Sequence, residues 1–299
     1  MRITPNITAY NSLYNLQQSR SILDQLQEKV ASGKNYNRPS DDPVMARQLI
    51  GFADQLRAGE QHASNMTKAT IWLKVTNAAL GGMASTMAEI KKLVSTLTNG
   101  TDMVEVRQNA AAQLETYKKQ LVDYGNTQLN GVYVMAGTGD NLTAPFSGSV
   151  YTGDDNNIDV EIGSSITQTM NITGGRVLKG SNTAPQQYGS VDILTELDNL
   201  IAAVNANDAA AITAGAQKME EGALQINAAI ADVGGRLTRL ENMQKFNLTT
   251  KNVIQGVVAD IQNADYTKLA VEMQQQQLAY QATLSSTAKI SQISLLDYL

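Results

Sequence analysis

Residues 66–97 read MTKATIWLKVTNAALGGMASTMAEIKKLVSTL, and this stretch decides the fold. One set of side chains, mostly apolar, recurs in it every seven positions: Met66, Leu73, Leu80, Met87 and Val94. A second set follows each of these by three positions: Ala69, Thr76, Met83, Ile90 and Leu97. Sustained 3-4 spacing is typical of a helix that packs along a partner helix. We therefore expect one helix from Pro43 to about Leu97, roughly 80 Å long at 1.5 Å per residue, and an elongated molecule.

Helical patterns recur on both sides of this stretch. We expect further helices over about 9–32, 103–128, 191–204 and 209–263, and a last one that follows a kink or cap at Asp265. The helix over 209–263 carries its own stripe: Ile226, Ile230, Val233, Leu237 and Leu240. The stripe of the last helix is interrupted by the glutamine run 274–277. Asp42 is expected to cap the long helix, with Pro43 as its first residue.

The middle of the chain has a different composition. Ten of the 22 glycines lie between Gly131 and Gly189, where residues 132–134 and 158–162 alternate with period two, as half-buried strands do. Residues 152–157 are interpreted as a hairpin turn. We therefore expect a small β domain, over 130–190, inserted between helices.

These elements predict a mainly α protein with an inserted β domain, built as an antiparallel bundle of long helices with paired terminal helices. Three parts are expected. A terminal pairing domain combines residues 1–42 with 264–299. A long-helix domain combines residues 43–129 with 191–263. The β domain takes residues 130–190.

Composition argues against several kinds of function. The net charge of -5 and the absence of a basic cluster do not favour nucleic-acid binding. No cysteine is present, and the single histidine, His62, has no neighbouring metal or catalytic motif. Residues 155–159 resemble the start of a calcium loop but lack its glycine and glutamate, so an Asx-rich turn is favoured. No membrane span, signal peptide, cofactor, metal site or enzymatic activity is expected.

The two terminal helices have thin apolar stripes diluted by Gln, Ser and Thr. Such helices are marginal in water and need a partner. The expected assembly residues are Leu16, Leu23 and Val30 at one end, and Leu269, Met273, Tyr280 and Leu284 at the other. We predict that these ends order on meeting each other and neighbouring subunits.

Several motifs resemble the flagellin superfamily. Residues 31–34 and the loop with Arg38, Pro39, Asp41, Asp42 and Pro43 are similar to the end of its N-terminal helix. Residues 133–137, 144–146 and 150–154 resemble the start of its β domain, although Val134 and Met135 stand where an aromatic is expected. Residues 233–241 resemble its central helix. The two prolines and the ending at 294–299 are similar to the branch that joins hook to filament, not to filament flagellins.

The resemblance implies a structural subunit of the bacterial flagellum at the junction between hook and filament. Its implied partners are a homo-oligomeric ring, hook-associated protein 1, flagellin and an export chaperone. It also implies an extracellular location reached by type III export without a cleaved signal peptide. Two alternatives stay open: a filament-forming flagellin, and a secreted coiled-coil adhesin.

Overall fold

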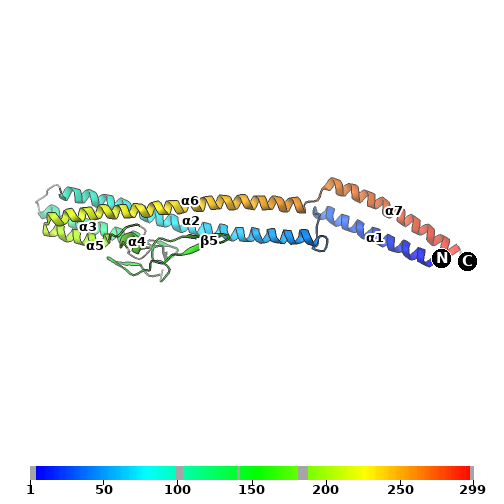
Figure 1. The fold of residues 1–299 in the computed structure, drawn as a ribbon, viewed down its shortest axis with the longest axis horizontal. Helices are drawn as coiled ribbons and strands as arrows, with labels where there is room; N and C mark the ends of the chain where they lie inside the picture. The colour runs from blue at the N-terminus through cyan, green and yellow to red at the C-terminus, as the bar shows by residue number, and fades with distance from the viewer. Residues whose placement is uncertain (1–4, 99–103, 140–141, 181–187, 297–299) are drawn as a thin grey trace. The chain divides into compact units, whose positions relative to one another are not determined.

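The structure, a computed structural model, describes residues 5–98, 104–139, 142–180 and 188–296 (Figure 1). Helices dominate these residues, and the strands are short. The helices are α1 (Pro5–Ser32), α2 (Pro43–Thr98), α3 (Val104–Gly125), α4 (Gly174–Leu178), α5 (Ile193–Ala206), α6 (Ala209–Gln262) and α7 (Tyr266–Leu296). The strands are β1 (Gln128–Leu129), β2 (Val132–Tyr133), β3 (Phe146–Ser147), β4 (Val150–Tyr151), β5 (Asp159–Gly163) and β6 (Ile166–Thr169).

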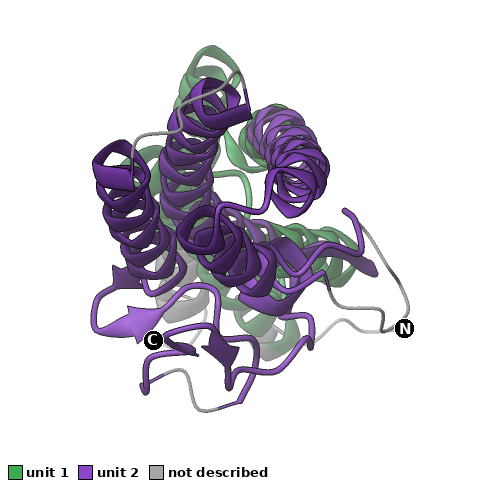
Figure 2. Ribbon diagram, turned by 90° about the vertical axis from the view of Figure 1, so that its left-hand side faces the viewer, with its two compact units in different colours: residues 1–57, 249–299 green, residues 58–248 purple. Residues whose placement is uncertain are grey.

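The chain divides into two compact units, coloured separately in Figure 2. One unit combines residues 1–57 with 249–299, and is called the terminal unit below. The other contains residues 58–248, and is called the central unit. The division into two units does not test the three-part domain organisation expected from the sequence, which stays a prediction.

The predicted long helix is confirmed as α2, and its start follows from local chemistry. Asp42 Oδ1 accepts hydrogen bonds from the backbone N–H groups of Val44 and Met45, both at 3.0 Å. These are donors that the first turn of a helix leaves without a partner in the helix. Pro43 occupies the first helical position, where a missing N–H costs nothing.

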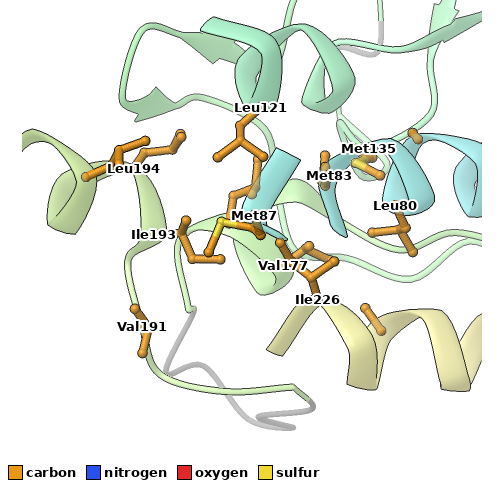
Figure 3. Packing of buried hydrophobic residues seen from close by; sticks show 14 of the residues in the cluster. Leu80, Met83, Met87, Leu121, Met135, Val177, Val191, Ile193, Leu194 and Ile226 are labelled. Carbon is orange, nitrogen blue, oxygen red and sulfur yellow. The ribbon is translucent and has the colours of Figure 1, made fainter. Parts of the chain in front are cut away.

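The seam predicted on α2 lies in the core of the central unit. Every member of its two sets from Met66 to Val94 is buried, and Leu97 is half-buried. The same cluster includes Leu114 and Leu121 of α3, Leu194 and Leu197 of α5, and Met219 and Ile226 of α6. Five of its methionines are completely buried: Met66, Met83, Met87, Met135 and Met219. Figure 3 shows Met83, Met87 and Met135 among Leu121, Val177 and Ile226.

The buried face of α6 differs from the predicted stripe. Ile226, Val233 and Leu240 are buried as expected, whereas Ile230 and Leu237 are only half-buried. Ala229 is buried at one of the intervening positions. Arg236 fills another, with its side chain 11% exposed, and donates to the carbonyl of Asn171 at 2.9 Å. This face of α6 therefore packs against the inserted segment and provides a hydrogen-bond donor for one of its carbonyl groups.

The inserted segment forms three separate two-stranded antiparallel pairs among its described residues. They are β1–β2, β3–β4 and β5–β6. Asn130 and Gly131 both have positive φ, which is the requirement for a tight two-residue hairpin turn between β1 and β2. Val134, Met135, Phe146, Ile162 and Val177 join the helical core cluster. The inserted segment therefore shares its core with the helices.

The interpretation of residues 152–157 as a hairpin turn is wrong. They connect β4 to β5, which pair with β3 and β6 respectively. Their polar side chains bond to distant segments: Asp154 accepts from the Thr138 N–H at 2.8 Å, and Asp155 from the Thr173 hydroxyl at 2.6 Å. Asp154 also accepts from the Asn156 N–H at 3.1 Å, a local bond of the kind that Asx residues make, but the segment does not join two strands that pair with each other.

One buried amide holds the inserted segment against α6. Gln225, 1% exposed, accepts from the Val191 N–H at 3.1 Å. It also donates to the carbonyls of Val177 at 2.7 Å and Val191 at 3.1 Å. Polar backbone that would otherwise be buried without partners is thereby satisfied.

Candidate assembly interface

The terminal unit is built on the pairing of α1 with α7, which lie side by side in Figure 1. Ser19 contacts Gln276, and Lys34 forms a β-bridge with Asn263. Residue numbers thus rise along α1 as they fall along α7, so the two helices are antiparallel. Segments from the two ends of the sequence form one helix pair.

The side chains withdrawn from solvent on each helix follow 3-4 spacing. On α1 they include Ser12, Leu16, Ser19, Leu23, Leu26 and Val30. On α7 they include Leu269, Met273, Gln276, Tyr280, Thr283 and Thr287. These two rows are called the terminal seam below. Such rows are what antiparallel helices present to each other along a coiled-coil-like contact.

The structure places six of the seven predicted assembly residues in the terminal seam: Leu16, Leu23, Val30, Leu269, Met273 and Tyr280. Leu269 is buried and the other five are half-buried. Leu284 lies outside the seam, with 44% of its surface exposed.

Sequence reasoning missed the polar members of the seam. Ser12, Ser19, Gln276, Thr283 and Thr287 occupy seam positions, but a search for apolar periodicity does not register them. The signal in the sequence that could have revealed them is their spacing of three and four residues from the apolar members of the seam. Gln276 is three residues from Met273 and four from Tyr280, as a seam position must be.

A short joint connects the break between α1 and α2 to the break between α6 and α7. The Asn35 N–H donates to the carbonyl of Gln262 at 2.8 Å, and the Asn35 side chain donates to the carbonyl of Asn263 at 3.0 Å. The Ala264 N–H donates to the carbonyl of Gly33 at 3.0 Å. We call residues 33–35 and 262–264 the joint. It anchors one end of the helix pair.

The helix ends beside the joint have matching caps. Gly33, at φ +68°, ends α1 in the left-handed conformation that glycine adopts without strain. Asp265 Oδ1 accepts from the N–H groups of Thr267 and Lys268, which confirms the cap expected at Asp265. The glutamine run does not break α7, which continues through it.

The loop with the family-like motif is ordered by its acidic residues. Asp41 Oδ2 accepts from the N–H groups of Asn37 and Arg38, and Asp42 caps α2. Arg38 forms an ion pair with Glu28 of α1 at 3.2 Å. Both charged groups are largely exposed, so this ion pair contributes little to stability. Pro39 and Pro43 are exposed.

The terminal unit buries very little apolar surface. Within its described residues, Ala264 and Leu269 are the buried apolar side chains. Many large apolar side chains are exposed: Ile7, Tyr10, Leu13, Tyr14, Ile22, Val44, Ile50, Val253, Val257, Tyr266, Val271, Leu278 and Leu284. An apolar surface of this extent usually marks an interaction site. The terminal unit is therefore the candidate interface.

Other groups offer little chemistry. No set of three or more His, Asp or Glu side chains close enough to hold a metal ion occurs in the described residues. Within the same residues, no helix has the length and hydropathy to cross a membrane. His62 Nδ1 is buried and has no hydrogen-bond partner among described groups.

The groups whose pKa is clearly shifted lie in the central unit, and two of them, Asp154 and Tyr151, are bonded to the inserted segment. Burial opposes ionisation of Asp154, but hydrogen bonds from Thr138 outweigh it and lower the pKa of Asp154. Burial, followed by the nearby Asp155 charge, raises the pKa of Tyr151, whose hydroxyl donates to the carbonyl of Met135 at 2.9 Å. Each shift favours the protonation state that makes these bonds.

Comparison with known proteins shows what this chain resembles. Residues 3–140 match the family model described as the bacterial flagellin N-terminal helical region. The chain therefore carries that flagellin region, and the resemblance to the flagellin superfamily is confirmed. Along nearly its whole length, the chain is similar to flagellar hook-associated protein 3 of Salmonella typhimurium. The two are 23% identical over 99% of this chain and 98% of the relative.

A flagellin is also among the relatives. Flagellin of Bacillus subtilis is 24% identical, over 98% of this chain and 97% of its own. Sequence identity alone thus does not separate the two kinds of relative.

Solved structures confirm the fold. A putative flagellar hook-associated protein from Vibrio parahaemolyticus matches with a TM-score of 0.65 and 22% identity, over 75% of this chain and 100% of its own. The flagellar junction protein FlgL from Legionella pneumophila matches with a TM-score of 0.59 and 17% identity, over 72% and 99%. The mainly helical architecture predicted from the sequence is therefore correct.

Proposed function

We propose that this chain is a structural subunit of the bacterial flagellum that forms the junction between hook and filament. The observation that carries the proposal is the terminal unit, which pairs α1 with α7 but leaves many of its large apolar side chains exposed. The similarity to flagellar hook-associated protein 3 along nearly the whole chain supports the choice of junction.

The mechanism is folding coupled to assembly. The terminal seam buries Leu269 fully and its other members only in part, so the isolated pair has little apolar burial to offset the entropy of ordering two long helices. Neighbouring subunits would cover the exposed apolar side chains and supply the missing burial. The ends would therefore become fully ordered at the growing tip of the flagellum.

The partners follow from this role. We propose that copies form a ring, with hook-associated protein 1 on one side and flagellin on the other. An export chaperone would bind α7 before secretion, and the chain would leave the cell through the flagellar type III apparatus without losing a signal peptide. Residues 1–42 with 264–299 would form the inner part of the ring, and residues 130–190 would face outward. The proposed role is structural and needs no cofactor.

Removal of residues 265–299 tests the role of the terminal pair. The truncated protein should remain helical, because the core of the central unit is untouched, but it should fail to join hooks to filaments. A finer pair of variants is Leu269→Asp, which puts a charge into the seam, and Thr267→Asp, which puts the same charge on an exposed position of α7. We expect loss of assembly in Leu269→Asp alone. Normal assembly by the truncated protein would refute the proposal.

Deletion of the gene distinguishes the junction role from its alternatives. A junction subunit predicts hooks without filaments and flagellin shed into the medium. A filament-forming flagellin, favoured by the similarity to the Bacillus subtilis protein, predicts that purified subunits grow long filaments unaided. An adhesin predicts normal filaments after deletion.

A further inference from the structure

The side of α6 that packs against the inserted segment also lines a pocket. This pocket has a volume of about 330 Å³ and belongs to the central unit. We call it the arginine pocket, and its lining residues are Gln168, Thr169, Asp232, Gly235, Arg236 and Arg239. A Cβ built at Gly235 would meet nothing within 4 Å, so no side chain closes the pocket at that position.

Two of the three charged groups in the arginine pocket neutralise each other. Arg236 donates to both carboxylate oxygens of Asp232, at 2.7 and 3.2 Å, and to the carbonyl of Asn171. The Tyr188 hydroxyl donates to the same carboxylate at 2.6 Å. Arg239 is exposed, and its guanidinium has no hydrogen bond or ion pair among the residues that the structure describes. The pocket therefore carries one positive charge that is not neutralised.

An amide in the wall of the pocket is also incomplete. Gln168 is 6% exposed, and its Oε1 is buried without a hydrogen-bond donor among the described groups. Its Nε2 donates to the carbonyl of Thr169 at 3.1 Å, which leaves the oxygen as the unsatisfied atom. Buried polar atoms without a partner are rare in folded proteins. A partner surface that closes over the pocket would bring a donor or trap water against this oxygen.

The unpaired guanidinium selects a carboxylate as the group that the pocket receives. Guanidinium and carboxylate groups match in shape and can form two parallel hydrogen bonds. A single exposed ion pair contributes only about 0–1 kcal/mol, so a small free anion would not stay bound. An acidic side chain of a neighbouring subunit differs, because the rest of the interface holds it in place.

Helix α3 carries matching charges. Glu105, Glu115 and Asp123 are exposed, and their carboxylates have no hydrogen bond or ion pair among the described residues. Glu115 and Asp123 are about two helical turns apart. Lys119 lies between them, and the three carboxylates outweigh its charge. Copies in a ring meet through two different faces, so a basic pocket and an acidic helix on the same chain are complementary.

We propose that Arg239 of one copy binds an acidic side chain on α3 of the next copy in the assembled flagellum. The inference rests on the proposed assembly role, and it adds a contact between central units to the contacts of the terminal units. The partner is a second copy of this chain, and the recognised group is the carboxylate of Glu105, Glu115 or Asp123. Charge pairs of this kind fix which surfaces meet and in what register.

Charge reversal at position 239 tests the pocket. Arg239→Glu should lower the fraction of cells that carry filaments several-fold, because like charges then face each other across the interface. Arg239→Lys keeps the charge and should retain most of the assembly. The matched control is Lys92→Glu, the same change in charge at an exposed, unpaired lysine of α2, and it should assemble normally. Thermal unfolding and the amount of secreted protein show whether each variant folds and is exported.

Charge exchange identifies the partner residue. Arg239→Glu is combined in turn with Glu105→Arg, Glu115→Arg and Asp123→Arg, so that each double variant recreates the pair with its charges exchanged. One of the three should restore filaments. The same α3 substitution, made alone, should reduce assembly, because two positive charges then meet.

Engineered cysteines report the contact directly, because the chain has none of its own. Gly235 lies in the arginine pocket, one helical turn from Arg239. Gln108, Ala112 and Gln120 are exposed on α3, each three residues from one of the candidate carboxylates. Gly235→Cys is combined with a cysteine at one of these three positions. In assembled flagella, one pair should form disulfides between chains on mild oxidation, and the single-cysteine variants should form none.

Several results would overturn the proposal. Normal assembly by a folded Arg239→Glu variant would do so, and so would an equal loss of assembly in Lys92→Glu. If no charge exchange restores filaments and no cysteine pair joins two copies, the pocket meets another partner. Should Arg239→Glu fail to fold, the cysteine pairs, which keep Arg239, decide alone. Gene deletion tests where the chain acts, whereas the disulfides test how copies meet, so either can fail without the other.

Discussion

The backbone N–H of Asn35 donates to the carbonyl of Gln262 at 2.8 Å, and this bond joins two helix breaks from opposite halves of the chain. Because both breaks meet at one point, α1 and α7 leave the joint together. The joint therefore anchors the paired helices at one end of the terminal seam.

Substitution of Gly33 should loosen the terminal pair. Gly33→Ala forces a side chain into the left-handed region, at a cost of about 1–2 kcal/mol. It also places a Cβ 2.6 Å from the hydroxyl of Tyr266, an exposed side chain that must shift to make room. Amide hydrogen exchange in α7 should accelerate. Gly51→Ala is the control, since a Cβ there meets open space within α2 and should be neutral or stabilising. Equal exchange rates in the two variants would argue against a role for the joint.

The adjacent glycines of α2 should respond in opposite directions. A Cβ on Gly82 would lie 2.5 Å from the ring of Tyr124, whereas one on Gly81 meets nothing within 4 Å. Gly82→Ala should lower the free energy of unfolding by about 1–3 kcal/mol through overpacking. Gly81→Ala should raise it by about 0.5–1 kcal/mol through reduced backbone entropy of the unfolded chain. Urea unfolding measures both, and a stabilising Gly82→Ala would show that the ring of Tyr124 is not held in place.

Loss of the Gln225 amide should destabilise the central unit. Gln225→Leu leaves backbone groups of Val177 and Val191 buried without partners, at about 1–3 kcal/mol for each group. Exposed Asn227 on the same helix provides the control, and Asn227→Leu should change stability by less than about 0.5 kcal/mol. Thermal unfolding distinguishes the two. Comparable effects at both positions would contradict the role assigned to Gln225.

Acid should remove a contribution made by Asp198. Burial opposes its ionisation, but hydrogen bonds from Lys118 at 2.5 Å and Ser149 at 2.6 Å outweigh it and lower the pKa of Asp198 below its ordinary 3.8. A lowered folded-state pKa means that the stabilisation is complete above about pH 4 and is lost as pH falls through the lowered value. The difference in unfolding free energy between the unaltered chain and Asp198→Asn should therefore shrink between pH 7 and pH 3. Since the group is partly exposed, the difference at pH 7 should stay below about 1 kcal/mol, and one that does not change with pH would refute this account.

Sequence periodicity predicted the helices well because their buried faces are regular. The row from Met66 to Val94 on α2 is buried throughout, so the apolar period and the buried period coincide. Caps could also be located, since Asp42 and Asp265 act through local bonds to N–H groups two and three residues ahead. The residue that signals a cap thus lies within a few positions of the backbone groups that it binds.

The missed features depend on contacts between distant residues. Arg236 lies on the buried side of α6 because Asn171, on the inserted segment, offers a carbonyl. Asp154 bonds to Thr138, which no turn pattern indicates. Gln276 occupies a seam position because Ser19 is small and lies opposite. A search for hydrophobic periodicity classes such polar residues as solvent-facing, although in the fold each has a hydrogen-bond partner.

Oxidation of the buried methionines would report how often the core of the central unit opens to solvent. Met66, Met83, Met87, Met135 and Met219 have no exposed surface, so peroxide reaches their sulfur atoms only when the helices separate. Oxidation of any of them would put a polar sulfoxide into a largely apolar core. The ratio of oxidised to intact methionine, read by mass spectrometry residue by residue, would therefore report how often each layer of the bundle opens.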